Sequence, residues 1–226
     1  MGQQRNLNTL IIMLYEIFDH MHLSSDEAVR EMLPLVSEQR RQQALRYQHT
    51  FGQFCCLKSY LMLLELLAAV YPELDKAKPE FGYTEKGKPF LLDRPNIHFS
   101  ISHTKNAILV AIADAPIGVD IEAFRSPSAA LIARTMNPTE QAAIAASAAS
   151  LEPSGTAYGP GTPEALFSAI WTRKEAVLKL RGTGIEGDLR EVLSGSETIL
   201  TRIFPRKGYA FSIAQQAISP FESFPC

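Results

Sequence analysis

Residues 166–184 read LFSAIWTRKEAVLKLRGTG, and this stretch decides the fold. Its apolar residues recur with the period of an α-helix and form one broad arc: Leu166, Phe167, Ile170, Trp171, Val177, Leu178 and Leu180. The polar residues Ser168, Thr172, Glu175 and Lys179 fall on the opposite side. Gly182 and Gly184 follow where a helix usually ends. The pattern therefore predicts one amphipathic helix over 167–180, closed by glycine.

Glu175 and Lys179 stand four residues apart on this helix. Taken alone, such a pair is typical of a solvated helix surface, where it contributes only a few tenths of a kcal/mol. A functional interpretation therefore needs further charged residues elsewhere in the chain.

Composition and charge narrow the class of protein. The chain has 226 residues and a net charge of −2, which does not favour bulk electrostatic binding to nucleic acid. Its three cysteines form no disulfide or zinc pattern, so we expect a cytoplasmic protein. The longest apolar run, residues 57–70, is interrupted by Lys58, Ser59 and Glu65. It predicts a buried core helix and no membrane span.

The remaining pattern mixes helices and strands. We expect a central, buried strand over 9–17, a helix over 26–32, a polar helix over 37–47 and, after a loop at Gly52, a long helix over 54–70. Strands over 97–102, 107–113 and 117–122 are expected to form an antiparallel meander. A helix over 134–149 with a cap near Asn137-Pro138, a flexible loop over 150–163 and a hairpin of 198–203 with 208–213 complete the prediction.

Two acidic residues mark the strand GVDIE, residues 118–122. Asp120 and Glu122 share one face of this strand, while Val119 and Ile121 take the other. Two carboxylates about 7 Å apart along one face repel each other unless a cation or solvent screens them. A hard cation such as Mg²⁺ prefers such oxygen ligands. The alternative is an edge strand with an acidic solvent-facing surface.

A second polar group, Ser102-His103-Thr104, ends the strand over 97–102 and is followed by Lys105. Hydroxyl donors beside a histidine that can carry charge near neutral pH suit a phosphate group. The alternative is that His103 is simply a turn residue.

In order, GKP (87–89), SISHT (100–104), GVDIE (118–122) and WTRKEAVLK (171–179) resemble the 4′-phosphopantetheinyl transferase superfamily, and the chain length resembles its monomeric Sfp-type branch. The resemblance implies an α+β fold of two similar halves, 1–115 and 116–226. Each half would be a small antiparallel sheet packed on a long helix, and the second half would carry the metal site.

The resemblance also implies roles for individual residues. Asp120, Glu122 and Glu175 match its metal ligands, and Glu175 also matches its proposed base. Lys179 matches a lysine on the coenzyme A pyrophosphate, and Lys88, Ser102 and His103 match the 3′-phosphate pocket. Glu140 resembles a further catalytic glutamate. For the phosphate-binding arginine of the first half we take Arg46, while Arg40, Arg41, His49 and Lys58 compete with it.

By this resemblance the chain would be a Mg²⁺-dependent enzyme that moves 4′-phosphopantetheine from coenzyme A to a serine of an apo acyl or peptidyl carrier protein. Adenosine 3′,5′-bisphosphate would leave. The chain is expected to be a monomer that serves fatty-acid, polyketide or peptide synthesis. Two alternatives stay open: another Mg²⁺-dependent phosphotransferase or phosphohydrolase, and a non-catalytic module that binds carrier proteins. The chain has no P-loop pattern that would indicate nucleoside triphosphate chemistry.

Overall fold

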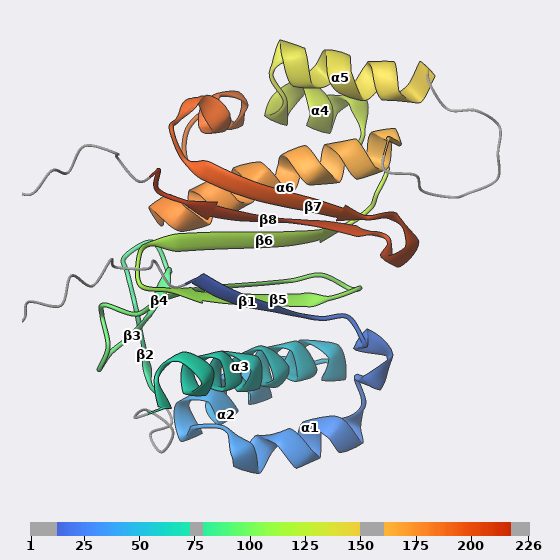
Figure 1. Cartoon of the computed structure of the whole chain (residues 1–226). Helices are drawn as coiled ribbons and strands as arrows, with labels where there is room; N and C mark the ends of the chain where they lie inside the picture. The colour runs from blue at the N-terminus through green and yellow to red at the C-terminus, as the bar shows by residue number, and fades with distance from the viewer. Residues whose placement is uncertain (1–12, 73–78, 150–160, 218–226) are drawn as a thin grey trace, which may run out of the picture.

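The computed structural model describes residues 13–72, 79–149 and 161–217 (Figure 1). It contains two three-stranded antiparallel sheets and a small hairpin. The first sheet has the order β1 (Met13–Phe18), β5 (Ile108–Ala113), β4 (His98–His103). The second has the order β6 (Ile117–Ala123), β8 (Tyr209–Gln215), β7 (Thr198–Phe204). The hairpin joins β2 (Phe81–Tyr83) to β3 (Pro89–Leu91).

Helices cover the outer face of each sheet (Figure 1). Helices α1 (Asp26–Met32), α2 (Glu38–Leu45) and α3 (Thr50–Val70) lie on the side of the first sheet. Helix α6 (Pro163–Arg181) packs on the second sheet, beneath α4 (Ala129–Thr135) and α5 (Pro138–Ala149). Four short 3₁₀ helices are described as well: η1 (Met21–Leu23), η2 (Leu33–Leu35), η4 (Leu189–Ser194) and η5 (Pro205–Lys207). The predicted α+β architecture, with a small sheet on a long helix in each half, is confirmed.

The two sheets share one apolar layer. Leu109 and Ala111 of the first sheet and Val119, Ile121 and Phe211 of the second belong to a single buried cluster. Burying this apolar surface, at about 25 cal/mol per Å², holds the two sheets together. The two halves therefore share part of their hydrophobic core.

Helix α3 has the length and composition of a membrane span, with a mean hydropathy of 1.5 over its most apolar window. However, Leu57, Tyr60 and Leu63 are fully buried, and 56% of that window lies inside the protein. These side chains form the core beneath the first sheet together with Phe99 and Val110. The prediction of a buried core helix is confirmed.

The predicted arrangement of strands is wrong in two respects. Strand β6 does not extend the meander, since it pairs with β8 in the other sheet. Strand β5 pairs with β1 on one edge and with β4 on the other, so it has no free edge for β6. For the same reason β1, predicted as a central strand, lies at the sheet edge. Its Leu14 and Tyr15 side chains are exposed.

Several helix boundaries also differ from the prediction. Helix α3 begins at Thr50, so Gly52 lies within its first turn and not in a loop. The residues expected in one helix over 134–149 fall in two helices, and α5 begins at Pro138, where the helix start was predicted. Helix α6 begins at Pro163, capped by Thr162, whose hydroxyl accepts from the Ala165 amide. The remainder of the predicted loop, residues 150–160, lies outside the described residues.

The polar side predicted for α6 is not a solvent face. Ser168 and Thr172 are buried, and Thr172 Oγ1 lies 2.8 Å from Ser212 Oγ of β8. The helix contacts β6 and β8 on one side and α5 and η4 on the other, so nearly every direction from its axis is occupied. Its hydroxyls are buried because they find hydrogen-bond partners there.

Candidate functional site

Strand β6 carries two acidic side chains on the face opposite the shared apolar layer. Val119 and Ile121 point into that layer, and the alternation of a β-strand turns Asp120 and Glu122 the other way. Asp120 is only 5% exposed. A buried carboxylate is costly unless hydrogen bonds and opposite charge compensate it, and Asp120 has both.

Three elements meet at Asp120. Ser102 Oγ of β4 donates to Asp120 Oδ1 over 2.8 Å, and Lys179 Nζ of α6 donates to the same oxygen over 2.7 Å. Lys179 Nζ also donates to Ser102 Oγ over 2.9 Å. Asp120 Oδ2 is buried and has no hydrogen-bond partner. The carboxylate therefore presents one satisfied oxygen and one that is free to bind a cation or a donor.

Two more carboxylates lie in the electrostatic field of Asp120. Burial and then the charge of Asp120 raise the pKa of Glu175, while Lys179 opposes the shift. Burial and Asp120 likewise raise the pKa of Glu122, and Arg125, Lys179 and a hydrogen bond with Trp171 oppose the shift. The site gathers more negative charge than Lys179 alone offsets.

Carboxylate oxygens are the ligands that a hard divalent cation prefers. Asp120 offers a buried oxygen without a partner, and its charge acts on both Glu122 and Glu175. A bound cation would stabilise the charged forms of these carboxylates. Among the described residues, no three acidic, histidine or cysteine side chains form a group that could hold a metal ion in the present geometry. At Asp120 the positive charge is supplied by the ammonium group of Lys179.

A cavity of about 250 Å³ opens beside Glu175. One wall is the turn from Lys86 to Pro89, and another is the β4 segment Phe99–Ile101. Glu175 and Lys179 of α6 line it as well. Glu175 is thus half-buried beside a cavity and does not project into bulk solvent.

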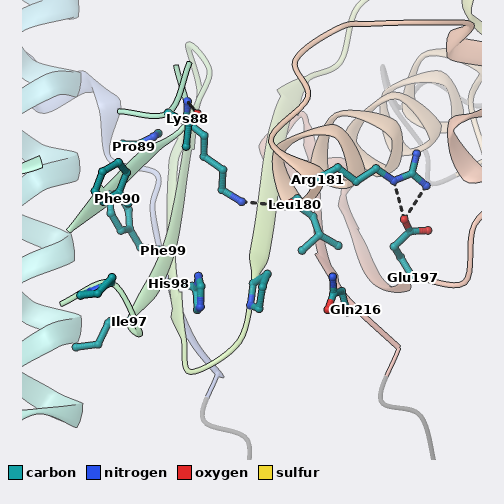
Figure 2. Close-up of a pocket in the computed structure, with 13 residues that line it drawn as sticks. Lys88, Pro89, Phe90, Ile97, His98, Phe99, Leu180, Arg181, Glu197 and Gln216 are labelled. Atoms are coloured by element: carbon teal, nitrogen blue, oxygen red, sulfur yellow. Dashed lines mark hydrogen bonds and ion pairs between the residues drawn. The ribbon is translucent and has the colours of Figure 1, made fainter. Parts of the chain in front are cut away.

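Lys88, predicted to bind phosphate, is held by the end of α6 (Figure 2). Its Nζ donates to the Leu180 carbonyl oxygen over 2.9 Å. Burial lowers its pKa. Lys88 lines the 250 Å³ cavity and a second cavity of about 440 Å³ that also includes His98, Arg181 and Glu197. The side chain therefore forms part of the partition between the two.

The other residues predicted to bind phosphate are placed differently. His103 ends β4, where desolvation and the positive charge of Lys179 lower its pKa. Arg46 is exposed at the C-terminal end of α2 and does not line the 250 Å³ cavity. The structure brings Ser102, His103 and Lys179 together and leaves Arg46 apart.

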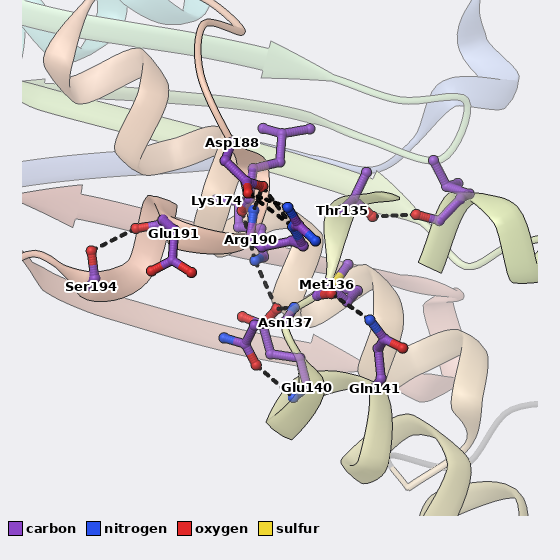
Figure 3. Close-up of polar contacts among 12 residues, drawn as sticks. Thr135, Met136, Asn137, Glu140, Gln141, Lys174, Asp188, Arg190, Glu191 and Ser194 are labelled. Atoms are coloured by element: carbon purple, nitrogen blue, oxygen red, sulfur yellow. Dashed lines mark hydrogen bonds and ion pairs between the residues drawn. The ribbon is translucent and has the colours of Figure 1, made fainter. Parts of the chain in front are cut away.

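Glu140 belongs to a separate polar cluster (Figure 3). Its Oε2 pairs with Lys174 Nζ over 2.7 Å and accepts from the Asn137 amide over 2.8 Å. Lys174 Nζ also donates to the Leu189 carbonyl oxygen over 2.9 Å. Lys174 is 1% exposed at its side chain and Glu140 is 12% exposed. This cluster joins α5, α6 and η4.

We expect Lys174→Met to lower the free energy of unfolding by about 3 kcal/mol, because it leaves the Glu140 carboxylate buried without a counter-ion. The double variant Lys174→Met/Glu140→Gln should recover part of this loss, since glutamine can still accept from the Asn137 amide. Urea denaturation of the two variants measures the difference. Equal stability of the single and double variants would contradict a role for the buried charge.

Two residues that shape this part of the structure carry no predicted role. Lys174 is buried and pairs with Glu140. A side chain at Gly118 would overlap the backbone of α6 at Ala176 and Leu180. Ser102, a candidate phosphate ligand by its sequence, contacts the Asp120 carboxylate in this structure. The alternating hydroxyls of residues 100–104 indicate that all three share one face of the strand.

Comparison with known proteins adds independent information. Residues 116–217, which include β6 and α6, match the sequence profile of the 4′-phosphopantetheinyl transferase superfamily. The chain is similar to a 4′-phosphopantetheinyl transferase of Bacillus subtilis, with 29% identity over 172 residues that cover 76% of the chain and 71% of that protein. A Synechocystis sp. protein assigned to the same transferase class is 30% identical over 179 residues, which cover 77% of the chain and 68% of that protein. The 4′-phosphopantetheinyl transferase HetI of Nostoc sp. is 29% identical over 191 residues, with 82% and 68% covered.

Proposed function

Because the chain belongs to the 4′-phosphopantetheinyl transferase superfamily and is an enzyme that transfers 4′-phosphopantetheine to carrier proteins, we propose how its own residues carry out this reaction. The donor is coenzyme A, bound in the 250 Å³ cavity between the Lys86–Pro89 turn and α6. The acceptor is a serine of an apo acyl or peptidyl carrier protein. The observation that carries the proposal is that Glu175 and Lys179 line that cavity while Lys179 also contacts Asp120.

We propose Asp120, Glu122 and Glu175 as the residues that hold Mg²⁺. When bound there, the cation would offset the charge that develops on a transferring phosphoryl group. The partnerless Oδ2 of Asp120 and the raised pKa values of both glutamates support this assignment. Lys179 is close enough to share its charge between Asp120 and a phosphate in the cavity.

Glu175 is the proposed base. It lines the cavity in which the donor is proposed to bind, where it could reach the carrier serine. In the reaction the carrier serine gives its proton to Glu175 while its oxygen attacks the phosphorus next to pantetheine. The bond from this phosphorus to the adenosine bisphosphate oxygen breaks, and Lys179 compensates the charge of the leaving group. Glu140 is less suited, since Lys174 and Asn137 occupy its carboxylate.

Mass spectrometry of apo carrier proteins tests the reaction. We expect incubation with the chain, coenzyme A and Mg²⁺ to add one phosphopantetheine to the carrier, and chelation of the metal with EDTA to prevent the addition. Release of adenosine 3′,5′-bisphosphate without carrier modification would instead indicate a hydrolase. Carrier binding without either product would indicate a non-catalytic module. Testing fatty-acid, polyketide and peptide carriers side by side identifies the acceptor.

A further inference from the structure

Strand β4 presents a row of hydroxyls to β6. The two strands belong to different sheets, yet they lie side by side where the sheets meet. Ser100 Oγ accepts from the Val119 amide over 3.0 Å, and Thr104 Oγ1 accepts from the Ala123 amide over 3.2 Å. Because side chains two apart share a face of a strand, the sequence SISHT sends all three hydroxyls toward β6. These bonds hold β6 at a defined position against β4.

The middle hydroxyl has a different partner. Ser102 Oγ contacts the Asp120 carboxylate and not a backbone amide. Ser102 is 8% exposed and Asp120 is 5% exposed, so water competes little for either group. A carboxylate oxygen only accepts and the Lys179 ammonium only donates. The hydroxyl proton of Ser102 must therefore point at Asp120 Oδ1, while its lone pair accepts from Lys179 Nζ.

The hydrogen bond from Ser102 fixes the orientation of the Asp120 carboxylate. With Oδ1 held by Ser102 and Lys179, the rotation of the Asp120 side chain is restricted, and Oδ2 is the oxygen left without a partner. A serine has one O–H group. Ser102 therefore cannot donate to a phosphate of the donor while it donates to Asp120.

We propose that Ser102 is a positioning residue, which orients Asp120 for the divalent cation, and that it is not a phosphate ligand. This inference rests on the metal site proposed above. Residues that orient a metal ligand in this way typically change metal affinity 10- to 100-fold when they are replaced. Thr104 belongs to the same row, and its hydroxyl accepts from the Ala123 backbone amide, so it serves as a matched control.

The first test measures the affinity of the full chain for Mn²⁺ alone, from the electron paramagnetic resonance signal of the free ion. We expect Ser102→Ala to weaken Mn²⁺ binding about tenfold. Thr104→Val should leave Mn²⁺ affinity unchanged, although it loses a hydrogen bond between the same two strands. If Ser102→Ala fails to fold, the near-isosteric Ser102→Cys, a weaker donor, should shift the affinity in the same direction.

The second test compares coenzyme A with dephospho-coenzyme A, which lacks the 3′-phosphate. As a positioning residue, Ser102 should show the same fold-loss in kcat/KM with both donors when it is replaced by alanine. A loss confined to coenzyme A would show a phosphate ligand and would overturn the inference. If the wild type binds Mn²⁺ tightly and Ser102→Ala binds it equally tightly, the inference about Ser102 is overturned while the proposed metal site stands. A wild-type chain that does not bind Mn²⁺ would overturn the metal site and the inference together.

Discussion

Glu175→Gln is expected to reduce turnover at least about 100-fold, the lower range for loss of a general base. Glutamine keeps the size of the side chain but cannot accept the proton of the carrier serine. The same substitution removes a carboxylate whose pKa is raised by burial and by the charge of Asp120. The variant should therefore be as stable as the wild type or more stable, as is common where a functional site is electrostatically strained.

Turnover is measured as the rate of carrier modification, and stability as the urea midpoint without donor or metal. Glu140→Gln is the matched control, since it neutralises the other candidate base and removes half of a buried ion pair. We expect that variant to lose stability and to keep most of its turnover below its unfolding temperature. Nearly unchanged turnover of Glu175→Gln, or a loss confined to Glu140→Gln, would assign the base to Glu140.

Gly118→Ala is expected to destabilise the chain by at least about 3 kcal/mol, the upper range for overpacking. Gly118 lies where β6 crosses α6, and a Cβ there would overlap the Ala176 carbonyl oxygen and the Leu180 amide nitrogen. Both are backbone atoms of a buried helix, which cannot rotate away as a side chain would. Helix α6 would have to move off β6, and the contact between Lys179 and Asp120 would lengthen with it.

Thermal unfolding measures this effect, and a loss of 3 kcal/mol corresponds to at least about 6 °C for a chain of this size. Gly161→Ala is the matched control, because a Cβ at Gly161 meets no atom within 4 Å. We expect that control to unfold at the wild-type temperature. A Gly118→Ala variant with unchanged stability and activity would show that β6 and α6 do not pack as tightly as the structure has them.

Local signals predicted the elements well. Gly182 and the apolar period before it mark the end of α6 because caps and periodicity act within one helix, whereas its Thr162 cap lies in the predicted loop. Asn137 and Pro138 mark the start of α5 for the same reason. The sequence also indicated which acidic groups lie together, since residues at alternate positions of one strand share a face.

The sequence did not indicate which strands pair with each other or which charged side chains form ion pairs. Asp120 pairs with Ser212 across β6 and β8, and no local pattern states that β6 leaves β5 for a strand so distant in the chain. The same holds for charged groups. Glu175 and Lys179 have the spacing of a surface ion pair, but Lys179 pairs with Asp120 instead.

The sequence by itself therefore determined the helices and strands, the α+β class and the acidic, basic and hydroxyl groups from which the site is made. Only the tertiary structure decided that Ser102 bonds to Asp120, that Glu140 is bound by Lys174 and that Lys88 closes the end of α6. The reason is physical. Periodicity and capping depend on neighbours along the chain, whereas a buried polar group takes the partner that packing places within reach.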